Sequence, residues 1–467
     1  MPVDPRLPVL AGWGVASDRD GALGAVDLME ASARRAVEVA PALGAAVDLV
    51  LVPQGTWRTG DPGRLVAGRL GATPRTVVAE LGVLQQTLLT RAAEDVAAGR
   101  ADVVLVVGGE ARAPARRDEP LEEVPVEPPA DEVLRPSGEI ITRLEIERGL
   151  AVPAAQYAVV DRALAAAEED DPATLSRRLG ELWAAFSEVA AASPDAWDRT
   201  AHSPHEIATP GPANRMIASP YTKLLCSQWN VSVDGALVVC SADAARRHGV
   251  ALEDCVFPVA AAESNAMIPM TARRDVHRSP GFALAGGRAL ELAGTTADAV
   301  DHLDLYSCFP AAVRVQAREL GIDPGRPLTV TGGMTFAGGP LNNYVLQSTA
   351  AMADRLRGAQ RTTGLVTSVS GMLTKQGVAV WSSDPPAGFR AAEVGEEVLA
   401  ATPTCPVVEE GDGEGRVVAA TVVHERGTPT AAVVLVDLAS GERTVATGDP
   451  VEHEVRATVR VEGQSLR

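Results

Sequence analysis

Cys308 is the residue of this chain whose type and setting best suit covalent chemistry. The apolar residues before it predict a strand, and the stretch from Pro310 onward predicts a helix, so the thiol lies at a predicted helix N-terminus. The positive end of a helix dipole lowers the pKa of a thiol from about 8.5. Two roles are open: a nucleophile or base, or a buried cysteine that only packs, the commoner fate of a free cysteine. The polar side chains expected nearby are Tyr306, Ser307 and Ser370.

Three short segments carry the strongest pattern in the second half of the chain. Residues 304–309 read DLYSCF, residues 332–341 read GGMTFAGGPL, and residues 364–371 read GLVTSVSG. Taken singly, a glycine-rich stretch that ends in Gly-Pro predicts only a tight connection between a strand and a helix. In this order and at this spacing, the three segments resemble motifs of the thiolase superfamily.

The resemblance implies that reactive residues have been replaced. The glycine-rich segment is similar to the Gly-Gly…Gly-His-Pro-Leu signature of thiolases, with Gly339 where the family keeps its catalytic histidine. The DLYSCF segment is similar to the His-Asp-Cys-Phe segment of sterol-carrier-protein-type thiolases, with the cysteine and the phenylalanine kept. In the third segment, Ser368 takes the place of the second catalytic cysteine.

The nucleophile position is also changed. Residues 87–99 and 101–110 resemble the thiolase helix and strand that follow the nucleophilic cysteine, and counting back along that helix reaches Gly82. No cysteine precedes Cys226, so the usual nucleophile is absent in any register. A thiolase needs a thiolate, a histidine that activates it, a second cysteine that moves the α-proton, and donors for the thioester oxygen. Because loss of a nucleophile unit costs about 10⁶ in rate, we expect no ordinary thiolase turnover.

The resemblance implies coenzyme A or acyl-CoA as the ligand, with no permanently bound cofactor and no metal. We expect a thiolase-like (acetyl-CoA acetyltransferase-like) protein that binds CoA thioesters between its core and a loop domain. Two alternatives stay open: an acyltransferase or thioesterase acting through Cys308 or a serine, and a non-catalytic partner in a lipid or sterol metabolic complex. The residues expected to bind substrate are Tyr306, Ser307, Phe309, Gly338, Gly339, Asn342, Asn343 and Ser370.

Asn342 and Asn343, directly after the glycine-rich turn, allow two interpretations. Asparagine is favoured at the N-cap of a helix, where its side chain accepts a hydrogen bond from the backbone. The same amides can instead donate hydrogen bonds toward a thioester oxygen. We expect them to cap the helix that the pattern predicts from Asn343 to Gly358.

Charge and composition restrict the partners. The formal net charge of -19 disfavours nucleic acid and anionic membranes, which attract basic surfaces. Lys223 and Lys375 are the only lysines. Nearly every cation is therefore arginine, which suits phosphate contacts, although codon bias is the alternative explanation. The five scattered cysteines form no disulfide framework and no zinc-ligand spacing. Without a signal-peptide pattern or a run of about 20 apolar residues, we expect a cytoplasmic protein.

An α/β fold must position these segments. Short apolar strands alternate with Ala-rich helical stretches, which predicts helices layered on a largely parallel sheet. The helix and strand at 84–98 and 102–107 recur at 343–358 and 363–369. Thiolases contain two such halves packed face to face, so the resemblance implies a thiolase fold with two similar βα halves in layers.

The resemblance also divides the chain into domains. Residues 1–250 form the expected first half, with a loop-domain insertion at about 111–230, and residues 251–387 form the second half. Within the insertion, residues 155–192 predict two helices. In thiolases such a loop domain covers the acyl-CoA site; a solvated helical excursion without a ligand is the alternative.

Residues 388–467 predict a small all-β, OB-like domain, because β-rich runs there alternate with glycine turns. The arrangement resembles actinobacterial thiolase-like proteins of type 1, which carry an additional C-terminal β-domain. OB folds bind single-stranded nucleic acid through basic grooves and stacked aromatic rings. Because no Phe, Tyr, Trp or Lys follows Phe389, we expect a protein partner for this domain and no nucleic acid.

Overall fold

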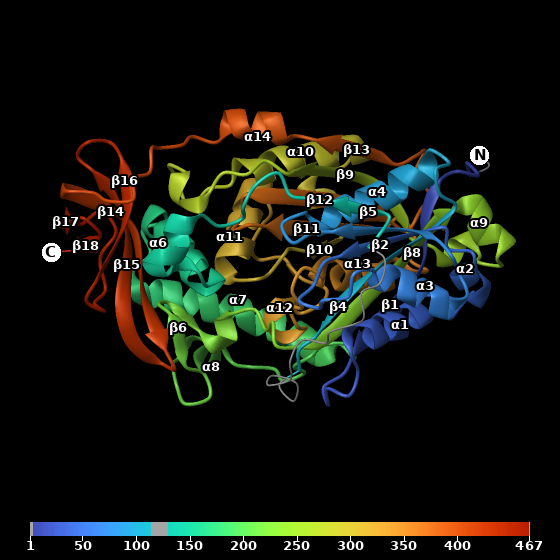
Figure 1. The fold of residues 1–467 in the computed structure, drawn as a ribbon, viewed down its shortest axis with the longest axis horizontal. Helices are drawn as coiled ribbons and strands as arrows, with labels where there is room; N and C mark the ends of the chain where they lie inside the picture. The colour runs from blue at the N-terminus through green and yellow to red at the C-terminus, as the bar shows by residue number, and fades with distance from the viewer. Residues whose placement is uncertain (1–2, 114–128, 467) are drawn as a thin grey trace.

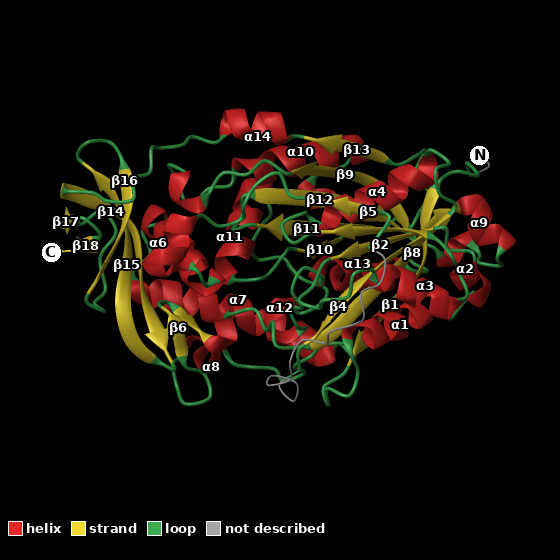
Figure 2. Ribbon diagram, viewed as in Figure 1, coloured by secondary structure: helices red, strands yellow, loops and turns green. Residues whose placement is uncertain are grey.

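The computed structural model describes residues 3–113 and 129–466, so residues 114–128 of the predicted insertion lie outside the described chain. Three β-sheets form its framework, with helices between and around them (Figures 1 and 2). The third sheet lies at one end of the molecule, next to the C-terminus, and the N-terminus lies at the opposite end (Figure 1).

The first sheet is mixed, whereas the sequence pattern predicted a largely parallel one. Strand β2 is parallel to β3 and β4, but β8 is antiparallel to both of its neighbours. The strands, in sheet order, are β1 (Pro8–Ser17), β8 (Ser232–Ser241), β4 (Val103–Ala111), β2 (Leu49–Pro53), β3 (Arg75–Ala79) and β5 (Glu132–Leu134). Short β5 covers the β3 edge, which would otherwise expose unpaired backbone groups.

The second sheet is also mixed. Strand β11 is parallel to β10 and antiparallel to β12, and β9 is antiparallel to β12 but parallel to β13. The strands, in sheet order, are β10 (His302–Asp304), β11 (Thr363–Ser370), β12 (Lys375–Ser382), β9 (Phe257–Ser264) and β13 (Arg390–Glu393).

Two helices fill the layer between these sheets. Helices α4 (Gln85–Ala97) and α13 (Tyr344–Leu356) each pack against strands of both sheets. Their buried alanines, which include Ala92, Ala93, Ala350 and Ala353, leave room for close packing on two sides. This is the pair of helices that the sequence predicted as a repeated βα unit, and the layered α/β fold is confirmed.

Further helices cover the outer faces. The first sheet is flanked by α1 (Ala25–Ala36), α2 (Pro41–Ala45), α3 (Pro62–Leu70) and α9 (Ala242–Arg247), and the second by α10 (Pro280–Ala293), α11 (Pro310–Leu320) and α14 (Gly395–Ala401). Short helical turns lie at η3 (Lys223–Leu225), η4 (Leu252–Asp254), η5 (Met270–Ala272), η6 (Ala297–Ala299) and α12 (Gly333–Phe336). Within the described residues, no helix has the length and apolar character needed to cross a membrane.

The described part of the predicted insertion is mainly helical. The two helices predicted over residues 155–192 are α6 (Pro153–Ala167) and α7 (Pro172–Ala192). Helix α7 begins where the Asp171 side chain accepts a hydrogen bond from Thr174 N–H and Pro172 occupies the first turn. The other elements are α5 (Arg143–Glu145), η2 (Ile146–Leu150), α8 (Pro204–Ala208), β6 (Met216–Ala218) and β7 (Tyr221–Thr222).

The C-terminal β-domain is confirmed as a closed barrel. Strand β15 pairs with both β14 and β16, and β17 and β18 complete the ring. The barrel strands are β14 (Gly413–Glu425), β15 (Thr428–Leu438), β16 (Arg443–Gly448), β18 (Ser465–Leu466) and β17 (Thr458–Glu462). The predicted boundary at residue 388 is too early, because residues 390–393 still pair with β9 in the second sheet.

The barrel is fastened to the rest of the molecule. Its sheet continues into β6 and β7 of the inserted region through the Val423–Ala218 pair, and α6 packs against β14. The Arg443 side chain is fully buried and pairs with Asp437, with Nε 2.7 Å from Oδ1. Its remaining N–H groups donate to the backbone carbonyls of Thr271, Arg273 and Arg274.

Candidate functional site

Gly82 lies just before α4, in a turn that suits glycine and little else. Its φ is +104°, and a Cβ atom there would lie 3.1 Å from Pro136 and 3.3 Å from Ile140. The Gly82 carbonyl accepts a hydrogen bond from Nζ of Lys375, at 2.7 Å. The space for a side chain at position 82 is thus filled by the connection between β5 and α5, and an amine from the other half of the molecule lies beside the backbone.

Gly339 lies near the end of the glycine-rich segment, and Ser227 occupies the space that a side chain at position 339 would need. A Cβ atom at position 339 would lie 2.2 Å from Ser227 Oγ. The same short segment joins Gly339 to Cys308, because Gln228 O accepts from Gly339 N–H at 2.9 Å and Cys308 O accepts from Ser227 N–H at 3.1 Å. The structure therefore brings the two predicted site positions together around residues 227–228.

Cys308 is enclosed by aromatic side chains. The ring of the next residue, Phe309, stacks on Tyr157 with centroids 4.8 Å apart and on Tyr221 with centroids 5.7 Å apart. Burial raises the pKa of Cys308 to about 12, although the Tyr157 side chain hydrogen-bonds the thiol and opposes this rise. The thiol lies before α11 as expected, but the predicted lowering of its pKa is wrong, because loss of hydration outweighs the helix dipole.

A buried hydrogen-bond network adjoins Cys308. Tyr344 Oη lies 2.5 Å from Thr331 Oγ1 and 3.4 Å from Ser307 Oγ, and it donates to Asp304 at 3.2 Å. Desolvation raises the pKa of the Asp304 carboxyl, which also accepts from Ser348 and Thr329. Two of the predicted motifs, 304–309 and 332–341, meet in this network together with α13.

Comparison with known proteins decides what this arrangement is. No protein-family model matches the sequence, and no curated protein matches it. Among solved structures, a monomeric SCP2-thiolase-like protein type 1 from Mycobacterium smegmatis superposes with a TM-score of 0.85 and 28% identity, over 100% of this chain and 99% of that one. The chain belongs to the thiolase superfamily.

More distant thiolases match a smaller share of the chain. The dimeric peroxisomal thiolase of Saccharomyces cerevisiae superposes with a TM-score of 0.60 and 14% identity, over 82% of this chain and 99% of its own. Human mitochondrial 3-ketoacyl-CoA thiolase in complex with CoA gives 0.58 and 16%, over 81% of this chain and 98% of its own. These two likenesses concern the fold alone.

The serines of the third thiolase-like segment lie in different surroundings. Ser368 is fully buried in β11, and its Oγ has no hydrogen-bond partner among the described residues. Its Cβ lies near Gly377, its partner on β12. Ser370 ends β11 and pairs with Lys375 across the turn. The amine of Lys375 lies on Gly82 O, so it belongs to the surroundings of position 82.

The asparagines after the glycine-rich turn do not behave as predicted. Asn343 occupies the N-cap position of α13, but its side chain makes no capping hydrogen bond. Both of its amide atoms are buried without a partner in the described chain, and Oδ1 faces Gly108. Asn342 has φ +56° and donates to Gln54 O at 3.1 Å. The capping prediction is wrong, because Gln85 Oε1, and not an asparagine side chain, accepts the hydrogen bond from Val345 N–H in the first turn, at 2.7 Å.

Tyr306 and Gly338 complete the predicted set. The Tyr306 backbone N–H donates to Thr367 Oγ1 at 2.7 Å, and its side chain hydrogen-bonds Gln85 at the start of α4. Tyr306 thus joins the second half of the molecule to the helix that follows Gly82. Gly338, with φ +97°, lies beneath Trp197 and Val233. It shapes the backbone of the turn and has no side chain to offer a ligand.

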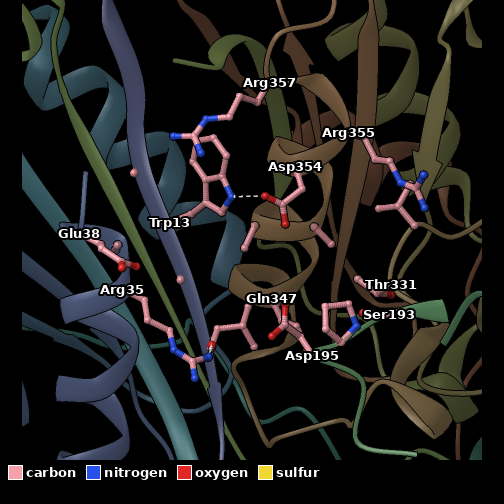
Figure 3. A pocket seen from close by; sticks show the side chains of 18 of the residues that line it. Trp13, Arg35, Glu38, Ser193, Asp195, Thr331, Gln347, Asp354, Arg355 and Arg357 are labelled. Atoms are coloured by element: carbon pink, nitrogen blue, oxygen red, sulfur yellow. Dashed lines mark hydrogen bonds between the residues drawn. The ribbon is translucent and has the colours of Figure 1, made fainter. Parts of the chain in front are cut away.

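A cavity of about 810 Å³ lies beside this network. Residues of β1, α1 and α13 and of the segment after α7 line it (Figure 3). On one side, Trp13 Nε1 donates to Asp354 Oδ1 at 2.7 Å, and the Arg357 guanidinium stacks 4.4 Å from the Trp13 ring centroid. The opposite side carries Arg35, Asp195 and Gln347 (Figure 3). The volume suits a small-molecule ligand.

One lining residue, Thr331, connects the cavity to the thiolase-like site. Thr331 lines the cavity and belongs to the Tyr344 network that ends at Ser307. Gln347 donates to Ala337 O at 3.0 Å, and its Oε1 is buried with no partner among the described residues. An unmatched buried acceptor of this kind is unusual and marks a place where a ligand or water donates.

Sequence reasoning missed two residues that shape the site. Ser227 lies in the return from the inserted region, and nothing in its local pattern links it to position 339. Lys375 was visible only as one of two lysines in a chain that otherwise uses arginine. That rarity was the available signal, since arginine cannot become a neutral base in a protein.

Proposed function

We propose that this protein binds CoA thioesters and does not run the ordinary thiolase cycle. The observation that carries the proposal is that a thiolase fold is kept while the side-chain spaces at Gly82 and Gly339 are filled by neighbours. A thiolase nucleophile and its histidine have no room there without movement of Ser227, Pro136 and Ile140. The thiolase fold is therefore kept, whereas the nucleophile and the histidine of the covalent cycle are absent.

The thiol of Cys308 does not replace the missing nucleophile. Only a thiolate attacks a thioester, and a Cys308 pKa of about 12 leaves almost none at neutral pH. Acyl transfer or thioester hydrolysis through Cys308 is accordingly the second candidate. This second candidate is supported only by the hydrogen bonds through residues 227–228 that connect Cys308 to Gly339.

The cavity gives the proposal a place for the ligand. Arg35 and Arg355 line it, and neither forms an ion pair with a carboxylate in the described chain. Asp195 in the same lining is the carboxylate that interacts electrostatically with Arg35, without a direct ion pair. Guanidinium groups that are not held in an ion pair suit the phosphates of coenzyme A. Thr331 in the cavity lining is hydrogen-bonded to Tyr344, whose Oη lies 3.4 Å from Ser307 Oγ, so a ligand held by these arginines would lie beside the network that adjoins Cys308.

Calorimetric titration with acetyl-CoA and longer acyl-CoAs, with free thiol measured in the same samples, tests the proposal. We expect binding without thiol release, and weaker binding in Arg35→Gln and Arg355→Gln. Arg288→Gln on the outer face of α10 is the matched control. Thiol release that Cys308→Ala abolishes would favour the acyltransferase or thioesterase. Absence of binding would overturn the proposal and favour a non-catalytic partner role.

A further inference from the structure

Lys375 is a buried cation without a counter-charge. Its side chain has no exposed surface, and its single hydrogen bond goes to the Gly82 carbonyl. No carboxylate of the described chain lies within 4.0 Å of Nζ. An ammonium buried in this way loses hydration that one hydrogen bond replaces only in part, so burial shifts the equilibrium toward the neutral amine. Desolvation accordingly lowers the pKa of Lys375.

The position of this amine is specific. Nζ lies 2.7 Å from the backbone oxygen of Gly82, the residue that precedes α4. Lys375 comes from β12, so the second half of the molecule delivers an amine to the place in the first half where the family resemblance puts a nucleophilic cysteine. Lys375 begins β12 and pairs with Ser370, two residues after Ser368, the position where the resemblance puts a second cysteine.

The choice of lysine is informative in this chain. Of 42 basic residues only two are lysine. Arginine stays charged at any ordinary pH, whereas lysine becomes a neutral base when it is desolvated. The other lysine, Lys223, is partly exposed in a short turn of the inserted region. A buried lysine beside Gly82 thus supplies the one basic group here that can accept a proton.

We propose that the Lys375 amine is a proton acceptor, which removes a proton from the carbon next to the thioester carbonyl of a bound acyl-CoA. This inference rests on the proposed function and adds a chemical step to it. The Nζ lone pair takes the proton, and the electrons of the C–H bond form the enolate, whose charge rests on the thioester oxygen. The ammonium then returns a proton to the same carbon, so no other bond breaks and no co-reactant is consumed.

Access to Lys375 requires movement of one cover. Pro136 and Ile140, which fill the space at Gly82, are both partly exposed and belong to the connection between β5 and α5. Displacing these two side chains would open the space beside Gly82, and neither residue belongs to a strand of the core sheets. The acyl group would take their place beside Nζ.

Solvent-deuterium exchange tests this inference. The protein is incubated in D₂O with the acyl-CoAs that it binds by calorimetry, and deuterium at the α-carbon is measured by mass spectrometry against a protein-free sample. We expect exchange with the wild type and a loss of about 10²- to 10⁴-fold in Lys375→Met, the usual contribution of a general base. Binding of acyl-CoA should stay unchanged in that variant.

Two further variants separate a base from a structural lysine. Lys375→Arg keeps a donor for Gly82 O but carries a permanent charge and cannot accept a proton, so we expect it to bind and not to exchange. Lys223→Arg is the matched control and should exchange like the wild type. Circular dichroism and thermal unfolding show which variants are folded.

The outcomes distinguish this inference from the proposed function. Binding without exchange in the wild type, or full exchange in a folded Lys375→Met, overturns the inference and leaves acyl-CoA binding standing. Absence of binding overturns both. The wild-type measurement decides the matter even where every Lys375 variant fails to fold.

Discussion

Cys308 and Lys375 are both enclosed in the core, yet burial acts on them in opposite ways. Removal from water disfavours the charged form of any group. The reactive form of a thiol is the charged thiolate. Burial raises the pKa of Cys308 to about 12 and so makes this thiol less reactive. The reactive form of an amine is the neutral one. Burial lowers the pKa of Lys375 and so increases the fraction of neutral amine.

The difference shows how a motif can direct attention to the wrong residue. Cys308 stands in a recognisable segment, and Lys375 stands in none. The environment, and not the motif, sets the direction in which the pKa of each group moves. Reactivity on this scaffold must therefore be read from each group together with its surroundings.

The largest expected effect is on alkylation of Cys308. At pH 8 an ordinary thiol is about one quarter thiolate, whereas a pKa of about 12 leaves roughly one part in 10⁴. Iodoacetamide should therefore modify native Cys308 roughly 10³-fold more slowly than the same cysteine in denaturant, as followed by peptide mass spectrometry. A native rate within tenfold of the denatured rate would remove the contrast with Lys375.

Restoring the family histidine tests the filled space next to Cys308. Gly339→His would drive its Cβ into Ser227 Oγ, 2.2 Å away, and close to Met334 O, at 3.1 Å. We expect a loss of about 2 to 3 kcal/mol in the free energy of unfolding by urea, of which Ser227→Gly restores part. Gly287→Ala on the open face of α10 is the control and should not destabilise. Unchanged stability in Gly339→His would mean that the space is vacant.

Glu263 extends the comparison to a carboxyl group. Burial raises its pKa to about 7 despite hydrogen bonds from Thr87 and Thr90 on α4. A folded-state pKa above the unfolded value means that its stabilising contribution is present below about pH 4.5 and is lost as pH rises through 7. Glu263→Gln should therefore gain stability over the wild type between pH 5 and pH 8, by at most about 3 kcal/mol.

Urea unfolding at the two pH values measures this gain. Glu291→Gln, on the exposed face of α10, is the matched control and should show no such pH dependence. An equal effect of Glu263→Gln at both pH values would show that the Glu263 carboxyl titrates normally.

The smallest expected effect is the pH dependence that Lys375 itself causes. Its folded-state pKa lies below 10.5, so its contribution to stability is present at high pH and is lost as pH falls through the folded pKa. The advantage of Lys375→Met over the wild type should therefore be largest at low pH and shrink as pH rises.

Nuclear magnetic resonance reads the same titration directly. With ¹³C-labelled lysine the chain gives two ε-carbon signals, and Lys223→Arg identifies which one is Lys375. We expect the Lys375 signal to titrate below pH 10.5. Titration of the Lys375 signal at the usual lysine pKa would mean that burial does not favour the neutral amine, and the contrast with Cys308 would be lost.

Much of the fold was predictable, because long periodic segments report it. The helices at 155–192, the paired βα units and the β-rich C-terminal run all appear in the structure. The start of the barrel was less predictable, because nothing in the local sequence of Arg390–Glu393 shows that this strand pairs with β9 in the second sheet. Strand β5, three residues long, gave no pattern that could reveal its pairing with β3.

The amino-acid sequence by itself determined the layered α/β scaffold and the absence of a cysteine before residue 226, because composition, order and periodicity are local properties of a chain. Tertiary structure decided the rest. It filled the spaces at Gly82 and Gly339, enclosed Cys308 in aromatic rings, and brought Lys375 to a carbonyl 293 residues away. Hydration lost on burial sets whether a titratable group is charged, and burial arises only when distant segments meet.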